Sequence, residues 1–170
     1  MLTIFACHAD LKKGDTLPPF KTLDDNGKEW SSEQQKGWLV VYFYPAAMTG
    51  GCTKQACSYR DGIKELNKKG ITVVGVSGDE VKNLAAFKEA HNLNFPLLSD
   101  FEGEVAKIFG VPTKKGGKIK KDINGKSMEL IRGLTTARWT YVINPDKKVA
   151  KVFNKVNPQS DFLEVLKVVK

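Results

Sequence analysis

Two apolar runs with a helical pattern between them constrain the fold more than any other feature of this sequence. Residues 38–45 read WLVVYFYP, and residues 71–77 read ITVVGVS. Runs that are this apolar and this rich in β-branched and aromatic residues are typical of strands buried on both faces of a parallel sheet. Between them, apolar residues recur at helical spacing at Ala56, Tyr59, Ile63 and Leu66. The sequence therefore predicts a strand–helix–strand unit at the centre of an α/β domain.

Shorter elements precede and follow this unit. Residues 16–30 predict a hairpin, because Asp25, Asn26 and Gly27 provide turn residues between two brief apolar segments. The later expected elements are a helix over 79–91, a strand over 95–100, a helix over 103–110, strands over 138–144 and 147–153, and a last helix capped by Asn157 with Pro158 at its first position. This order predicts an α/β fold with a mixed central sheet flanked by helices and an N-terminal β-hairpin.

The net charge is +8, and the lysines are densest within residues 112–134. An Asn124-Gly125 turn makes a protruding hairpin the expected structure there. A nucleic-acid site would also need a docking element or exposed aromatic residues, and neither is evident, so we interpret the lysines as a solvated surface. Such a surface would still favour an acidic protein partner. No apolar run approaches the ~20 residues of a membrane helix, so we expect neither a nucleic-acid nor a membrane partner.

The 170 residues suit one domain, and the N-terminal segment stands apart from it. The sequence MLTIFACHA resembles the end of a secretory signal, with cleavage after Ala9, but it lacks a basic region and its apolar part is shorter than ~7 residues. We expect a leader or signal remnant over residues 1–10 and a domain over 11–170. The location is predicted to be cytoplasmic, with a periplasmic or secreted protein as the alternative. Cys7 is assigned no role.

Cys52 and Cys57 lie at the start of the helix predicted after the first buried strand. The carboxyl ends of parallel strands are where active sites collect, and the unpaired N–H groups of a helix N-terminus favour a thiolate, which is the reactive form of cysteine. In a regular helix the two Cα atoms would lie roughly 8.7 Å apart. A disulfide needs about 7 Å or less, so this pair could bond only if the first helical turns unwind.

Three other interpretations of the cysteines stay open at this point. A zinc site would need four closely spaced ligands, and no C-x2-C pair is present. A dithiol oxidoreductase normally has C-x-x-C, whereas the spacing here is C-x4-C. Two buried structural cysteines are the plain alternative, because free cysteine is among the most buried residue types.

The neighbouring residues resemble one known family. PAAMTGGC fits P-x-x-x-T-x-x-C, the active-site signature of the peroxiredoxins, and CTKQAC resembles their bacterioferritin-comigratory-protein (PrxQ) branch. The segments LKKGDTLPPF, VVYFYP, NFPLLSD and ARWTYVIN are similar to the same branch, in the same order. The resemblance covers nearly all of residues 11–170.

This resemblance implies a thioredoxin-like fold and a peroxidase that reduces hydrogen peroxide and organic hydroperoxides. Cys52 would be the peroxidatic cysteine, which attacks the O–O bond and becomes a sulfenic acid. Thr49 would hydrogen-bond the thiolate and the peroxide, Arg138 would keep the sulfur ionised, and Pro45 would shield it. Thr49 could instead be only a helix cap, Pro45 only a strand terminator and Arg138 only a surface residue.

The same resemblance implies that Cys57 is the resolving cysteine, that the disulfide is reduced by thioredoxin or a similar dithiol protein, and that no metal, haem or flavin cofactor takes part. A monomer or weak dimer is expected. A one-cysteine mechanism and a redox sensor that uses the same cysteine pair as a switch are the alternatives. The sequence departs from the branch in two places: Gly50 replaces the usual proline before the Gly-Cys pair, and residues 112–134 are longer than the matching region of short members. The second departure makes Arg132 a rival for the role of Arg138.

Overall fold

The computed structural model describes residues 10–169, and its main feature is a seven-stranded mixed sheet of order β2-β1-β5-β4-β3-β8-β9. The parallel centre consists of β3 (Trp38–Phe43), β4 (Ile71–Ser77) and β5 (Leu97–Ser99). Antiparallel strands complete both edges: β1 (Lys21–Asp24) and β2 (Glu29–Ser31) at one, β8 (Thr140–Ile143) and β9 (Val149–Phe153) at the other. The predicted α/β order and the N-terminal hairpin are confirmed.

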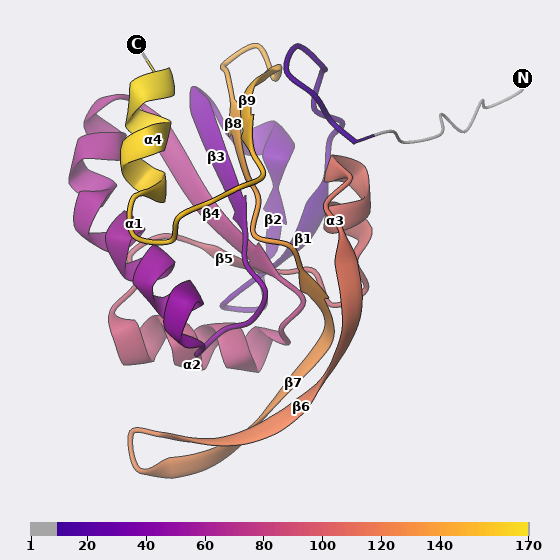
Figure 1. Ribbon diagram of the computed structural model, residues 1–170, viewed down its shortest axis with the longest axis vertical. Coiled ribbons are helices and arrows are strands. Elements are labelled where there is room, and N and C mark those ends of the chain that lie inside the picture. Colours follow the sequence, from indigo (N-terminus) through magenta and orange to yellow (C-terminus); the bar gives the residue numbers. More distant parts are fainter. Residues whose placement is uncertain (1–9, 170) are drawn as a thin grey trace, which may run out of the picture.

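Helices cover both faces of this sheet (Figure 1). One face carries α1 (Gly50–Lys68), α2 (Val81–His91) and α4 (Asp161–Val168), and the other carries α3 (Glu104–Phe109). Strand β3 serves both layers: Val40 and Tyr42 face the core under α1, whereas Val41 and Phe43 face the core under α3. This alternation explains why the whole strand is apolar in sequence.

The lysine-rich segment forms a separate long hairpin of β6 (Thr113–Ile123) and β7 (Lys126–Thr136). Asn124 and Gly125 both have left-handed backbones, with φ of 51° and 78°, as a tight two-residue hairpin turn requires. Figure 1 shows that the hairpin curves past the lower end of the sheet and that its tip lies below α2. Leu130 is fully buried, and Met128 packs against the core under α1.

The predicted start of the last helix was wrong, because the helix does not begin at Pro158 with Asn157 as its cap. Residues 157–160 form a turn, in which the Asn157 side chain accepts a hydrogen bond from Gln159 N at 3.0 Å and its carbonyl accepts one from Ser160 N at 3.2 Å. The helix begins at Asp161. Asparagine competes for local backbone donors in this way, so it formed a turn where a helix cap was predicted.

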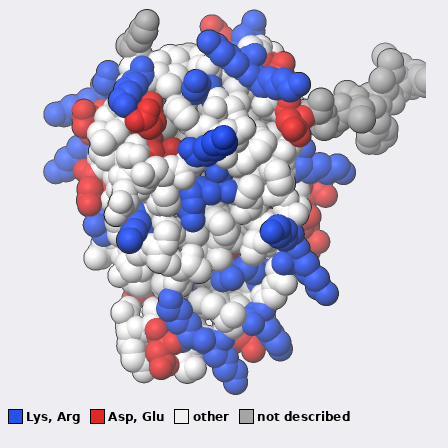
Figure 2. All heavy atoms as spheres, viewed as in Figure 1, with Lys and Arg blue, Asp and Glu red and all other residues white. Residues whose placement is uncertain are grey.

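The predicted leader and Cys7 lie almost wholly outside the described residues, so the division into residues 1–10 and 11–170 stays a prediction. Among the helices of the described part, none is both long enough and apolar enough to cross a membrane. The six lysines of the β6–β7 hairpin are all exposed, as expected. Figure 2 shows several basic side chains on the part of the surface that the hairpin forms.

Candidate active site

Cys52 lies in the first turn of α1, directly after the loop that leaves β3. We call residues 44–49 the thiol loop. Its first residue continues the β3–β4 pairing, since Tyr44 N donates to Val76 O at 3.1 Å. Cys52 is 1% exposed, so its sulfur is enclosed by protein.

The most specific contact of Cys52 is with Arg138. Arg138 Nη2 lies 3.3 Å from Cys52 Sγ, and Arg138 Nη1 donates to Gln55 Oε1 at 2.6 Å. The guanidinium fits here because Gly51 has no side chain: a Cβ at that position would come 3.2 Å from Arg138 Nη2. A permanent cation with fixed donor directions is therefore held against the sulfur.

The buried carboxylate of Asp161 holds Gln55, the residue that accepts the second hydrogen bond from Arg138. Asp161 Oδ2 accepts hydrogen bonds from Gln55 Nε2 at 2.8 Å, Tyr59 OH at 2.7 Å and Thr140 Oγ1 at 2.8 Å. Burial raises the pKa of Asp161 above its ordinary value, although these hydrogen bonds act in the opposite direction. The chain of contacts from Cys52 through Arg138 and Gln55 ends on α4 and fixes the guanidinium in place.

Sequence reasoning missed Gln55 and Asp161. The sequence offered two weak indications of these residues. Gln55 falls on the buried side of α1, three residues after Cys52, and Asp161 is the first residue of a helix whose buried face is otherwise apolar. A polar residue on a buried helical face needs a partner, and that requirement could have drawn attention to both.

Thr49 precedes α1 at the N-cap position, but its side chain does not cap the helix. Its hydroxyl donates to Ala46 O at 2.9 Å, within the thiol loop. Among residues 10–169, no hydrogen bond joins Thr49 to Cys52. Pro45 is half-buried and lines a cavity of about 340 Å³ together with Pro112, Thr136 and residues beside them.

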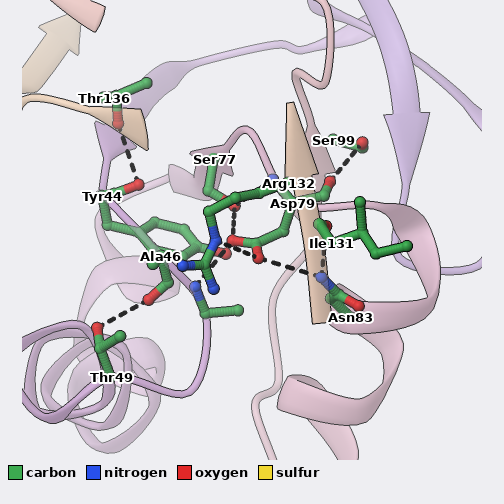
Figure 3. Close-up of polar contacts among 11 residues, drawn as sticks. Tyr44, Ala46, Thr49, Ser77, Asp79, Asn83, Ser99, Ile131, Arg132 and Thr136 are labelled. Carbon is green, nitrogen blue, oxygen red and sulfur yellow. Dashed lines mark hydrogen bonds and ion pairs between the residues drawn. The ribbon is translucent and has the colours of Figure 1, made fainter. Parts of the chain in front are cut away.

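Arg132, the rival for the role of Arg138, is directed to a different group. Its Nε lies 3.2 Å from Asp79 Oδ1, and the two side chains are 11% and 0% exposed. Figure 3 shows Arg132 pointing at the carboxylate of Asp79, beside the thiol loop. Of the two arginines, Arg138 is therefore the one that reaches the sulfur.

Cys57 lies further along the same uninterrupted helix and is half-buried. Both Cys52 and Cys57 are free thiols in this structure. Since α1 is regular over both positions, a bond between them requires the first turns of the helix to open. Within the described residues, no three His, Cys, Asp or Glu side chains gather as metal ligands.

Comparisons with known proteins agree on one family. The sequence profile of the AhpC/TSA family matches residues 13–152. Peroxiredoxin Bcp of Escherichia coli is 40% identical over 145 residues, which cover 85% of this chain and 86% of the relative. The chloroplastic peroxiredoxin Q of Sedum lineare is 38% identical over 162 residues, covering 94% of this chain and 78% of the relative.

Solved structures give the same result. The crystal structure of peroxidoxin BcpB from Mycobacterium tuberculosis superposes with a TM-score of 0.77 at 36% identity, covering 94% of this chain and 96% of that one. A structure of the bacterioferritin comigratory protein of Xanthomonas campestris, studied for its alkyl peroxide reduction activity, gives a TM-score of 0.73 at 25% identity, with 93% and 95% coverage.

Proposed function

This chain belongs to the AhpC/TSA family, and on that premise we propose that Cys52 is the nucleophile with which it reduces peroxides. The protein is a peroxiredoxin of the Bcp/PrxQ kind, a thiol-dependent peroxidase with a thioredoxin-like fold. Its reaction needs a hydroperoxide and a thiol reductant. We further propose the roles of individual residues, the kind of reductant and the kind of peroxide.

One observation carries the assignment of Cys52: Arg138 Nη2 lies 3.3 Å from its sulfur at the N-terminus of α1. Both the guanidinium and the N–H groups at the helix N-terminus are donors that can hydrogen-bond a thiolate, which is the nucleophilic form of cysteine. The thiolate attacks the terminal oxygen of ROOH, the O–O bond breaks, and the alkoxide RO⁻ leaves and is protonated to ROH. Cys52 is thereby oxidised to the sulfenic acid, and Arg138 is placed to stabilise the charge that grows on the leaving oxygen.

Thr49 and Pro45 complete the proposed site from the thiol loop. The Thr49 hydroxyl now donates to Ala46 O, which leaves its lone pairs free to accept a hydrogen bond from the incoming peroxide. Pro45 borders one surface cavity and Thr49 borders another, and a small organic hydroperoxide could approach the thiol loop from the side of Thr49. The alkyl peroxide reduction described for the Xanthomonas campestris relative supports organic hydroperoxides as substrates beside hydrogen peroxide.

Cys57 is proposed as the resolving cysteine. Its thiol attacks the sulfur of the Cys52 sulfenic acid, a disulfide forms and water leaves. Because the two residues share one helix, the step needs local unwinding of α1 and no second chain, which supports a monomer. A thioredoxin-like dithiol protein then reduces the disulfide. A cytoplasmic location fits this cycle, since cytosolic thiols are kept reduced.

Two variants and one mapping experiment test the proposal. Wild-type protein, Cys52→Ser and Cys57→Ser are supplied with hydrogen peroxide and a thioredoxin system, and peroxide consumption is followed. We expect steady turnover only in the wild type. Peptide mapping after one equivalent of peroxide should show a Cys52–Cys57 disulfide. Turnover in Cys52→Ser would refute the nucleophile assignment, and an oxidised wild type without the disulfide would indicate the one-cysteine mechanism.

A further inference from the structure

The thiol loop contains a backbone conformation that must be held from outside. Met48, the residue before Thr49, has a left-handed backbone with φ of 65°. A long side chain rarely adopts this region, and such strain persists only where surrounding contacts fix it. The loop therefore needs external partners to keep Thr49 and the start of α1 in place.

Asp79 is the main external partner of this loop. Its carboxylate is fully buried and accepts hydrogen bonds from Ala47 N at 2.8 Å, Ser77 Oγ at 2.9 Å and Asn83 Nδ2 at 3.3 Å. Arg132 Nε supplies a fourth donor at 3.2 Å. The bond from Ala47 N to Asp79 fixes the backbone one residue before Met48.

Arg132 brings the long hairpin into this arrangement, because it belongs to β7. The same hairpin makes two further contacts to the loop: Thr136 Oγ1 donates to Tyr44 O at 3.0 Å, and Lys121 Nζ donates to Met48 O. Backbone bonds tie β7 to the segment around Asp79 as well, from Gly133 N to Gly78 O at 3.0 Å. The hairpin thus holds the loop at both of its ends and, through Asp79, in its middle.

The buried pair is poorly suited to stabilising the fold alone. Arg132 Nη2 is buried without a hydrogen-bond partner among the described residues, and so is Asn83 Oδ1. A buried ion pair with unmet donors seldom offsets the desolvation of its charges. Its geometry fits a different role, since it orients one carboxylate toward the backbone of the thiol loop.

We propose that Asp79 is a positioning residue of the peroxidase, and that Arg132 holds its carboxylate so that the thiol loop presents Thr49 to the peroxide. Neither side chain touches the sulfur. The hairpin is then a structural part of the active site, and its inner face acts on catalysis through Asp79. This inference rests on the proposed role of Cys52.

Only a carboxylate meets the demands of this position. Four donors converge on its two oxygens, and an ionised carboxylate carries no hydrogen of its own. The variant Asp79→Asn keeps the shape but turns an NH₂ group toward donors, whichever way the amide is oriented. It also leaves Arg132 buried without its counter-charge.

The test compares peroxide reduction with simple alkylation of the same thiol. We would measure the second-order rate constants of Cys52 with hydrogen peroxide and with iodoacetamide, in Cys7→Ser/Cys57→Ser protein so that Cys52 is the one remaining thiol. Both reagents must reach the enclosed sulfur of Cys52, but alkylation does not need Thr49, whereas peroxide reduction does. For Asp79→Asn we expect the peroxide rate to fall about 10- to 100-fold, as for small misplacements of a reacting group, with alkylation nearly unchanged.

Two further variants act from the hairpin and leave the carboxylate intact. Arg132→Gln should reproduce the selective loss, and Arg132→Lys should recover much of the peroxide rate because it restores a cation beside Asp79. Glu129→Gln removes the exposed Lys118–Glu129 pair of the same hairpin, which spans 3.9 Å, and should change neither rate. If Asp79→Asn does not fold, as judged by circular dichroism, the Arg132 pair decides the question.

Three outcomes would overturn the proposal: an unchanged peroxide rate in the folded variants, a loss that alkylation shares, or an Arg132→Lys variant as impaired as Arg132→Gln. Cys52→Ser protein, measured in parallel, shows whether the positioning role or the proposed function has failed. If Cys52→Ser still reduces peroxide, Cys52 is not the nucleophile. If Cys52→Ser does not reduce peroxide and Asp79→Asn reduces it at the normal rate, only the positioning role of Asp79 is refuted.

Discussion

Arg138 donates through one guanidinium nitrogen toward the sulfur of Cys52 at 3.3 Å and through the other to Gln55 at 2.6 Å. Arg138→Gln should therefore lower the rate constant with hydrogen peroxide by about 10²- to 10³-fold, the cost of losing one donor to the developing charge. The rate constant of Arg138→Lys should lie between those of the wild type and Arg138→Gln, because lysine keeps the charge but lacks the rigid guanidinium that reaches both Cys52 and Gln55. Stopped-flow measurements would check this, with exposed Lys64→Gln on α1 as the control.

Cys57→Ser should reduce one equivalent of peroxide and then stop. The Cys52 sulfenic acid would form at the normal rate, but no thiol on α1 would remain to condense with it. Mass spectrometry should find sulfenic or more oxidised Cys52, and an added small thiol should restore turnover. The matched variant Cys7→Ser is expected to turn over like the wild type. Full thioredoxin-supported turnover in Cys57→Ser would show that this residue does not resolve the intermediate.

Gly50→Pro should stabilise the folded protein and slow disulfide formation. Gly50 is the first residue of α1, where proline is tolerated, and a Cβ there meets nothing within 4 Å. A compatible proline stabilises by about 0.4–1 kcal/mol through the unfolded chain. The same energy opposes unwinding of the first turns and should slow the Cys52–Cys57 bond by about two- to five-fold.

Denaturant unfolding and quenched-flow mapping of the disulfide would measure both effects of Gly50→Pro. Gly51→Ala is the contrasting variant, since its Cβ would come 3.2 Å from Arg138 Nη2 and should impair peroxide reactivity. Faster disulfide formation in a stabilised Gly50→Pro protein would show that opening of the first turn does not limit the reaction.

Asp161→Asn should flatten part of the pH dependence of stability. Burial raises the pKa of Asp161 above 3.8, so the folded state binds this proton more readily than the unfolded chain does. Its contribution to the free energy of unfolding is complete below pH 3.8 and is lost as the pH rises through the folded pKa. Asp161→Asn has no proton to lose at this position, so its free energy of unfolding should not fall for that reason over that pH range. Burial also raises the pKa of Asp100, but this group is common to both proteins and cancels in the difference.

Urea unfolding of wild type and Asp161→Asn, from below pH 3.8 to neutrality, would give the two stability profiles. The difference between them should change with pH only between the pKa of Asp161 in the unfolded chain and its raised pKa in the folded state. A constant difference over the whole range would mean that Asp161 titrates alike in the folded and unfolded states.

Most of the fold was predictable because its signals are local. The apolar runs of β3 and β4 and the spacing of Ala56, Tyr59 and Leu66 depend only on which faces are buried. The position of Cys52 at a helix N-terminus followed from the same pattern. The start of α4 was missed because Asn157 satisfies backbone donors in a turn, and sequence spacing does not reveal which of two local hydrogen-bonding patterns is preferred.

By itself, the sequence determined the order of strands and helices and the placing of both cysteines on one helix, since side-chain periodicity and turn residues act over a few positions. Only the tertiary structure decided which arginine faces the sulfur, what holds Gln55 and which carboxylate supports the thiol loop. Those contacts join residues 32 to 106 positions apart. They depend on how the sheet and the long hairpin fold back on α1, because packing over such separations leaves no periodic trace along the chain.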